Sequence, residues 1–273
     1  MSEVQPNGFL GSQALWVGPD GALAAELGLG LLRVELAQAL RQVPGRETFL
    51  WPPDGARWVV KRFHGGSPRD RWYARWWAHD RRSPGQREYE LLLELARAGV
   101  RVPKPVAWFQ SDADSLLMMD RVPAESDLRQ ILTEDPKAWA RFRRPLLALV
   151  VGLHGPARGT ERFHRDLYLQ HILVEVGTEQ LWLIDVGRVG LGPKVRQRWL
   201  EKDLAALAHS APASLGHTER LAWLGRYLTL RLGSLPRREH RARLMRWARA
   251  IDTRRARMAR HRPRFGETGP MGG

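Results

Sequence analysis

The chain has 273 residues, enough to bury a substantial core in one bilobal domain or in two small domains. It contains no cysteine, which excludes a disulfide framework, a thiolate metal site and a cysteine nucleophile. The formal net charge of +15 indicates an anionic partner, such as nucleic acid, acidic lipid or a phosphorylated glycan.

The first forty residues carry few structural signals. Met1–Asn7 has no basic segment followed by an apolar stretch, so no signal peptide is expected. Nowhere in the whole chain does a stretch approach 18 uncharged apolar residues, so no transmembrane helix is expected either. The segment Phe9–Leu40 is apolar and rich in glycine, with helical spacing in Leu31–Leu40. We interpret it as a leader segment.

The following residues have β-type patterns. Two runs, Thr48–Trp51 and Arg57–Phe63, flank the turn signal Pro52–Gly55. They predict a hairpin whose second strand carries Lys61. Beyond it, basic and aromatic residues are interleaved: Arg69, Arg71, Trp72, Tyr73, Arg75, Trp76, Trp77, Arg81 and Arg82.

An amphipathic helix is predicted over Gln86–Gly99, because apolar side chains recur at helical spacing and a glycine ends the pattern. The two prolines in Val102–Trp108 indicate a linker, and Ser115–Met119 is typical of a buried strand. We place the end of the β-rich half near Asp120.

The second half is predicted to be mainly helical. Helices are expected over Ser126–Leu132 and Pro136–His154. Two strands, Ile172–Val176 and Leu181–Ile184, should follow, and then helices towards the C-terminus. The fold class is therefore α+β, with a small β-rich lobe over residues 1–120 and a helical lobe over residues 121–273.

The segment His164–Leu167 carries the strongest chemical signal. It reads His-Arg-Asp-Leu and precedes two short strands, after which the chain reads Asp-Val-Gly from Asp185. Protein-kinase-like enzymes have a catalytic loop of this kind, then two strands and a second aspartate, with one carboxylate at the acceptor hydroxyl and the other at Mg²⁺. Alone, His-Arg-Asp favours an exposed charged turn before a strand, whereas the spacing, the intervening hairpin and the upstream lysine together favour the kinase-like interpretation.

Upstream, Lys61 lies in Trp58–Phe63, which resembles the strand that holds the α- and β-phosphates in kinases. Glu88 falls early in the next predicted helix, where a kinase-like fold needs an acid to pair with that lysine. Glu90 and Glu94 lie on the same helix, so an ordinary solvated face explains a glutamate there equally well.

These segments together resemble the lipopolysaccharide kinase family, which contains the core heptose kinases and the Kdo kinases. The resemblance runs from about Trp58 to Tyr227. It is carried by four segments: Val59–Arg62, Gln86–Tyr89 with Ala98–Pro105, His164–His171, and Arg198–Leu207. It implies a bilobal protein-kinase-like fold and an ATP-dependent kinase for a sugar of the lipopolysaccharide inner core, with heptose favoured and Kdo or another small molecule as alternatives.

Three departures from the general kinase pattern stand out. His171 replaces the usual asparagine, so it is interpreted either as a metal or phosphate contact, as a group that orients Asp166, or as a structural histidine. No Gly-x-Gly-x-x-Gly precedes the strand lysine, since only Gly45 and Gly55 are available. No Ala-Pro-Glu follows Asp185, which favours a small-molecule acceptor over a protein.

The predicted site follows from these assignments. Asp166 would accept the proton of a sugar hydroxyl, and adenine would contact the backbone near Leu117–Asp120, the expected link between the lobes. The full prediction is catalytic roles for Asp166, Arg165 and His171, cofactor binding by Lys61, Glu88, Met118 and Met119, and metal binding by Asp185 and His171, with ATP and Mg²⁺ as cofactors.

Residues 237 to 264 contain twelve arginines against two acids, more than a solvated helix face requires. We interpret this region and the arginine- and tryptophan-rich segment as facing anionic inner-leaflet lipid or glycolipid phosphates. The partners would be the lipopolysaccharide core glycolipid and the membrane surface, with the chain peripheral on the cytoplasmic face of the inner membrane.

Two other classes explain part of the sequence. A nucleic-acid-binding protein would account for basic residues interleaved with aromatics, but not for the order of the lysine, His-Arg-Asp and Asp-Val-Gly motifs. No nucleic acid is therefore expected. A kinase-like scaffold without activity would account for His171 and the missing glycines, but not for the retained Lys61, Asp166 and Asp185. An aminoglycoside-type kinase or a protein kinase is a further alternative.

Overall fold

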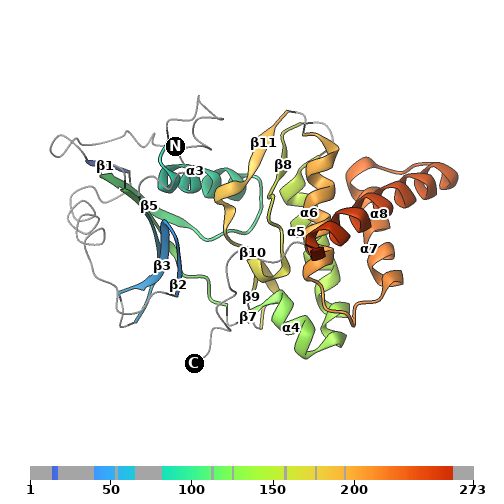
Figure 1. Cartoon of the computed structure of the whole chain (residues 1–273), viewed down its shortest axis with the longest axis horizontal. Helices are drawn as coiled ribbons and strands as arrows, with labels where there is room; N and C mark the ends of the chain where they lie inside the picture. Colours follow the sequence, from blue (N-terminus) through green and yellow to red (C-terminus); the bar gives the residue numbers. More distant parts are fainter. Residues whose placement is uncertain are drawn as a thin grey trace. The chain divides into compact units, whose positions relative to one another are not determined.

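The computed structural model describes residues 14–17, 40–52, 55–64, 82–111, 114–124, 126–156, 159–175, 177–193 and 195–260. The chain forms two compact units, and each is described here by itself (Figure 1). The first unit comprises Met1–Glu94 and Pro103–Arg121, and the second comprises Leu95–Val102 and Val122–Gly273.

The first unit is built on a six-stranded sheet in which every described pair is antiparallel. The strand order is β1-β5-β6-β4-β3-β2. Its strands are β1 (Ala14–Val17), β2 (Arg41–Val43), β3 (Arg46–Trp51), β4 (Trp58–Phe63), β5 (Pro105–Ser111) and β6 (Asp114–Asp120). It also contains the helix α3 (Pro84–Arg97) up to Glu94, and the residues from Leu95 belong to the second unit.

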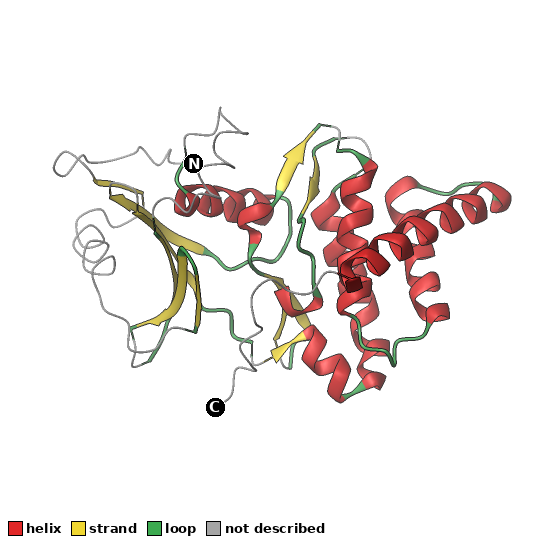
Figure 2. Ribbon diagram, in the orientation of Figure 1, coloured by secondary structure: helices red, strands yellow, loops and turns green. Residues whose placement is uncertain are grey.

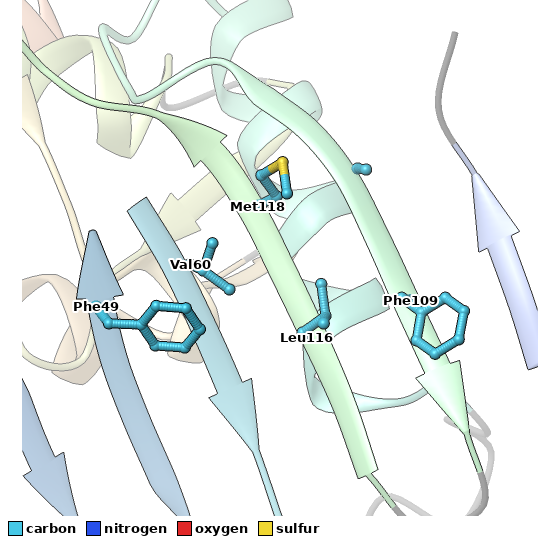
Figure 3. Packing of buried hydrophobic residues seen from close by; sticks show 6 residues of the cluster. Phe49, Val60, Phe109, Leu116 and Met118 are labelled. Carbon is cyan, nitrogen blue, oxygen red and sulfur yellow. The ribbon is translucent and has the colours of Figure 1, made fainter. Parts of the chain in front are cut away.

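One face of this sheet forms an apolar core in which cross-strand neighbours pack together (Figure 3). Val60 pairs with Phe49 on one side and with Met118 on the other, and Leu116 pairs with Phe109. These side chains are at most 5% exposed. The alternation of inward and outward residues along β4 therefore determines which side chains lie outside this cluster, Lys61 among them.

The helix α3 begins at an N-cap and lies against the sheet. The Ser83 hydroxyl accepts a hydrogen bond from the Gln86 N–H at 3.3 Å, and Pro84 occupies the first helical position. A Cβ at Gly85 would lie 2.6 Å from the carbonyl oxygen of Leu116, so the helix start approaches the β6 backbone as closely as only glycine permits.

The second unit is mainly helical (Figure 2). Its helices are α4 (Leu128–Glu134), α5 (Trp139–His154), α6 (Gln197–Ser210), α7 (His217–Leu232) and α8 (Arg237–Arg260), with single turns η1 (Pro136–Ala138), η2 (Leu169–His171) and η3 (Val186–Arg188). Its strands are β7 (Ser126–Asp127), β8 (Glu161–Phe163), β9 (Ile172–Glu175), β10 (Gln180–Leu183) and β11 (Gly190–Gly192). They form a three-stranded sheet, β10-β9-β7, and a β11-β8 pair.

The structure corrects two element predictions. The predicted linker over Val102–Trp108 is largely strand β5, because Pro105 occupies the first strand position, where a missing N–H is tolerated, and an apolar run follows it. The helix expected from Ser126 starts at Leu128 instead, because the Asp127 carboxylate caps it by accepting from the Gln130 N–H at 2.9 Å.

Two sequence interpretations fall mostly outside the described residues. These are the leader segment, of which β1 and Leu40 are described, and the arginine- and tryptophan-rich segment, of which only Arg82 is described. Among the described helices, none is long and apolar enough to cross a membrane.

Candidate active site

In the first unit, the structure brings the predicted pair Lys61 and Glu88 together. Lys61 lies on β4, between Thr48 of β3 and Leu117 of β6, and its Nζ is 2.5 Å from Oε1 of Glu88 on α3. The two side chains are 10% and 2% exposed. Glu90, the nearest alternative on the helix, instead pairs with Arg82 at 2.5 Å. The tertiary structure thus singles out Glu88 as the lysine's partner.

Met118 and Met119 lie on β6, which pairs with β4 on one edge and β5 on the other. Both side chains are buried, and that of Met118 belongs to the apolar core. The backbone N–H groups at the end of the strand are also bonded: that of Asp120 donates to the Lys104 carbonyl oxygen, and that of Arg121, the next residue, donates to the Arg57 carbonyl oxygen. The adenine contact assigned to this strand stays a prediction.

The hairpin between β2 and β3 encloses a two-residue turn, because Val43 pairs with Arg46. Gly45 takes the left-handed conformation there, with φ of 79°. Its carbonyl oxygen accepts a hydrogen bond from the His64 N–H at 3.0 Å. This tight turn has no second glycine, in keeping with the missing glycine-rich motif.

In the second unit, the segment His164–Leu167, called here the catalytic-loop segment after its predicted role, is hydrogen-bonded to the buried Asp203 on α6. One carboxylate oxygen accepts from the backbone N–H of His164 at 2.6 Å, and the other accepts from the N–H of Arg165 at 2.7 Å. Asp203 is fully buried. Because a buried carboxylate must be paired, these two bonds fix the loop backbone directly before Asp166.

A relay of buried polar groups completes the pairing of Asp203. The Nε2 of His154 lies 3.3 Å from the Asp203 carboxylate, and its Nδ1 lies 2.8 Å from the Tyr227 hydroxyl. Burial raises the pKa of the Tyr227 phenol, which therefore stays protonated and donates to Nδ1. His154 then donates from Nε2 to the carboxylate.

Arg165 lies with its backbone in the left-handed region, at φ of 75°, and its side chain is buried. Its guanidinium carbon is 5.5 Å from the centroid of Phe163 and 5.2 Å from that of Trp199, two rings that stack on each other. In this structure Arg165 supports the loop by packing, through cation–π contacts, rather than presenting its charge to solvent.

Asp166, the predicted proton acceptor, has a cation on each side of its carboxylate. Arg188 donates from Nη1 to Oδ2 at 2.5 Å, and the Lys202 Nζ lies 4.0 Å from Oδ1. The backbone carbonyl oxygen of Asp166 accepts from the Tyr168 N–H at 2.9 Å and from Nδ1 of His171 at 2.8 Å. Two residues that follow Asp166 in the chain are therefore hydrogen-bonded back to its carbonyl oxygen, which fixes the backbone on the C-terminal side of Asp166.

Asp185 and His171 are brought together at the start of η3. Asp185 has φ of 57° and ψ of 49°, a left-handed conformation that aspartate tolerates better than most residues. The His171 carbonyl oxygen accepts from the N–H of Ile184, so the two segments are joined directly before the aspartate. The Nε2 of His171 lies 4.0 Å from the Asp185 carboxylate.

The Asp185 carboxylate fits a Mg²⁺ site of the kind that relies on substrate phosphates, and the His171 ring beside it can contact one of the ion's waters. Nδ1 of His171 donates to the Asp166 carbonyl oxygen, which leaves Nε2 facing the Asp185 carboxylate. Mg²⁺ usually takes one or two carboxylates and completes its shell with water and phosphate oxygens. Within the described residues, no group of three or more His, Asp or Glu side chains could hold a metal unaided.

The sequence reasoning missed three charged residues of this site: Asp203, Arg188 and Lys202. One signal was present for the first of these, because Asp203 lies among Leu200, Leu204 and Leu207 on the apolar face of a helix, where an acid needs buried partners. No signal of spacing marked the two cations, which reach Asp166 only through the tertiary fold.

Replacing Asp203 by asparagine should reduce the free energy of unfolding by about 2–4 kcal/mol, because two charge-assisted bonds to backbone N–H groups are lost in a buried setting. Urea unfolding measures the change. The matched control is Asp252→Asn, since Asp252 is exposed on α8 and its pair with Arg255, at 3.5 Å, is a surface one. Equal effects of the two substitutions would contradict the anchoring role of Asp203.

The buried His164 should make stability fall in acid. Desolvation lowers the pKa of its imidazole below the ordinary value, so the folded chain keeps the ring neutral while the unfolded chain protonates it below about pH 6.5. We expect the free energy of unfolding to decrease as the pH falls from 7 to 5, by up to about 1.4 kcal/mol per pH unit from this residue. The slope should be smaller in His164→Asn; identical slopes in both proteins would refute the assignment.

Most of the chain is similar to proteins of one known family. The Lipopolysaccharide kinase (Kdo/WaaP) family model matches residues 52–224. The lipopolysaccharide core heptose(I) kinase WaaP of Pseudomonas aeruginosa is 25% identical over 93% of this chain and 95% of its own length. The 3-deoxy-D-manno-octulosonic acid kinase of Vibrio parahaemolyticus is 30% identical, over 36% of this chain and 40% of its own length.

A solved structure of WaaP in complex with acyl carrier protein has a TM-score of 0.61 to this chain, at 22% identity, and covers 87% of this chain and 98% of that one. The likeness confirms the α+β, protein-kinase-like fold predicted from the sequence. Because the family model spans the lysine strand, the catalytic-loop segment and the helix of Asp203, this chain belongs to the lipopolysaccharide kinase (Kdo/WaaP) family.

Proposed function

We propose that this chain transfers the γ-phosphoryl group of ATP to a hydroxyl of heptose in the lipopolysaccharide inner core. The observation that carries the proposal is the loop segment His164–Asp166, whose backbone is held by the buried Asp203 so that the Asp166 carboxylate is fixed in place. The family membership supports a sugar kinase, and the relative that matches along almost its whole length is a heptose(I) kinase.

In the proposed reaction, a hydroxyl oxygen of the sugar attacks the γ-phosphorus and the new O–P bond forms as the bond from the γ-phosphorus to the bridging oxygen breaks. Asp166 takes the hydroxyl proton, and ADP leaves. Lys61, oriented by its 2.5 Å bond to Glu88, contacts the α- and β-phosphates. Most of the rate enhancement would come from positioning and charge neutralisation.

Asp185 would hold Mg²⁺, and His171 would contact the ion or one of its waters through Nε2. The ion, when bound, would neutralise charge on the phosphate oxygens. His171 also has a role that needs no metal, because its ring donates to the carbonyl oxygen of Asp166 and so positions the loop. This contact supports the interpretation that His171 orients Asp166.

Wild-type protein should transfer label from γ-labelled ATP to dephosphorylated lipopolysaccharide core, and Asp166→Ala should reduce the rate by about 10²–10⁴-fold because the proton acceptor is removed. Glu134→Gln, an exposed residue at the end of α4, should transfer at the wild-type rate. A second acceptor that ends at Kdo and lacks heptose distinguishes the two sugar classes. Transfer to that truncated acceptor alone would replace heptose by Kdo, and equal activity of Asp166→Ala would refute the mechanism.

We further propose that α8 docks on the anionic surface that carries the glycolipid, with the chain peripheral on the cytoplasmic face of the inner membrane. Seven arginines of the helix are exposed and form no ion pair with any described residue: Arg237, Arg238, Arg241, Arg246, Arg249, Arg257 and Arg260. Met245, between Arg241 and Arg249 on the same side, is 40% exposed. A cationic face with an exposed apolar residue suits an acidic interface.

An acyl carrier protein is a second partner that we propose, since the WaaP structure was solved with one. In this chain, an apolar pocket of about 90 Å³ lies among α5, α6, α7 and α8, beside the arginine-rich helix. Its lining includes Leu146, Leu204, Leu207, Leu221, Leu224 and Ile251. A pocket of this chemistry could take an alkyl chain while arginines contact acidic side chains.

Reversing two charges on α8, with Arg241→Glu and Arg249→Glu together, should weaken co-sedimentation with anionic vesicles at least about tenfold, since each basic residue near such a surface contributes about 1 kcal/mol. The charge-matched control is Arg129→Glu with Lys137→Glu. Both residues are exposed, Arg129 on α4 and Lys137 on η1. The same proteins are then tested for acyl carrier protein binding. If the charge reversal weakens binding to only one of the two, vesicles or acyl carrier protein, that one is the partner of α8. If it weakens neither, or if binding to both is independent of salt concentration, both proposals are contradicted.

A further inference from the structure

The two cations around Asp166 form a feature that the proposed function does not use. Arg188 ends η3, three residues after Asp185, and Lys202 lies on α6, directly before Asp203. Arg188 contacts one oxygen of the Asp166 carboxylate at 2.5 Å, and Lys202 approaches the other at 4.0 Å. Two positive charges thus face one negative charge.

Lys202 is the less well paired of the two. Its side chain is 29% exposed, and its only described acidic neighbour within ion-pair distance is Asp166 at the 4.0 Å limit. Asp203, the next residue, is occupied by backbone N–H groups and by His154. Burial lowers the pKa of the Lys202 ammonium, so a further anion beside it would be stabilising.

Aromatic packing fixes Lys202 in position. Its Nζ lies 5.9 Å from the centroid of Trp199, whose ring stacks on Phe163 at 5.1 Å. The same ring carries Arg165 at 5.2 Å. The ammonium is therefore held on a rigid support that also supports the catalytic-loop segment, as a preorganised electrostatic site requires.

Arg188, in contrast, can change partner. Its side chain is 51% exposed, so its guanidinium can turn away from Asp166 without breaking a buried contact. Such a turn would make Oδ2 of Asp166 available as well as Oδ1, because a carboxylate oxygen bonded to a guanidinium is a poor acceptor for the proton of a hydroxyl. A guanidinium released in this way prefers a ligand with two oxygens in one plane, such as a phosphoryl or carboxylate group.

We infer that Arg188 and Lys202 bind an oxyanion next to Asp166, with Arg188 exchanging the Asp166 carboxylate for that ligand when substrate is bound. The inference rests on the proposed function and assigns two further catalytic residues to it. The oxyanion is either the terminal phosphoryl group of the nucleotide or a carboxylate of the acceptor glycan. Either ligand would release Oδ2 of Asp166 from Arg188 and neutralise the surplus positive charge.

The test uses Arg188→Gln and Lys202→Gln in the full chain, with Arg196→Gln as the control. Arg196 is exposed at the N-terminus of α6 and loses the same charge. Calorimetric titration with ATP and with ADP gives a readout independent of turnover. If the terminal phosphoryl group is the ligand, both variants should bind ATP about tenfold more weakly and ADP as the wild type does, while Arg196→Gln is unchanged. Arg188→Lys should recover part of the loss, because it restores the charge but not the fork.

If a carboxylate of the acceptor is the ligand, ATP and ADP affinities should be unchanged in both variants. The affinity for free 3-deoxy-D-manno-octulosonic acid should instead fall about tenfold, and the KM for the glycan should rise by about the same factor. Wild-type affinity for nucleotide and for the acid in both variants, together with an unchanged kcat, would overturn the inference. Circular dichroism and urea unfolding of each variant identify a loss that is due to misfolding.

A failure of the proposed function has a different signature, since it would appear in the wild type as an absence of nucleotide binding and transfer. The oxyanion site is then probed with inorganic phosphate by ³¹P line broadening. Weaker broadening in both variants than in Arg196→Gln would support the site without the kinase reaction, and equal broadening would exclude it.

Discussion

The second unit depends on one buried carboxylate. Asp203 lies on α6 with no exposure to solvent, yet it must remain charged or strongly hydrogen-bonded, because an unpaired buried acid would destabilise the fold by several kcal/mol. The backbone N–H groups of His164 and Arg165 supply its partners. The demand for pairing inside the core thus fixes the loop that carries Asp166, so the geometry of the candidate site is a consequence of core electrostatics.

The same logic of paired charge organises the other chemical groups. Lys61 and Glu88 are both buried in the first unit and neutralise each other. In the second unit, His154 and Tyr227 extend the pairing of Asp203 across α5 and α7, which ties three helices to the catalytic-loop segment. Asp166 differs, because it stands at a partly exposed position with an excess of positive charge around it. A substrate anion would complete that arrangement, whereas the buried groups need nothing from outside.

How far the sequence predicted the site can be judged from particular residues. Asp166 and Asp185 are predicted as site residues from their order along the chain and from the two strands between them, and the structure forms those strands as β9 and β10. Glu88 was one of three candidate acids on its helix, and only the packing of α3 on the sheet selected it. Arg188 and Lys202 were missed, because contact between η3, α6 and the loop depends on how the chain folds back on itself. The prediction of a linker over Val102–Trp108 was wrong because it took Pro105 as a sign against a strand. A proline at the first position of a strand removes no hydrogen bond between strands, and Pro105 is the first residue of β5.

By itself, the sequence determined the elements with strong local patterns, the order of the chemical motifs, the excess of positive charge and the resemblance to the lipopolysaccharide kinases. These properties follow from periodicity, turn chemistry and composition, which act over a few residues or over the whole chain. Only the tertiary structure decided which acid meets Lys61, which buried carboxylate anchors the loop, and which cations face Asp166. Those contacts join residues that are 27, 39 and 22 positions apart. No local pattern encodes them, because they arise where separate elements must pair their charges as they pack together.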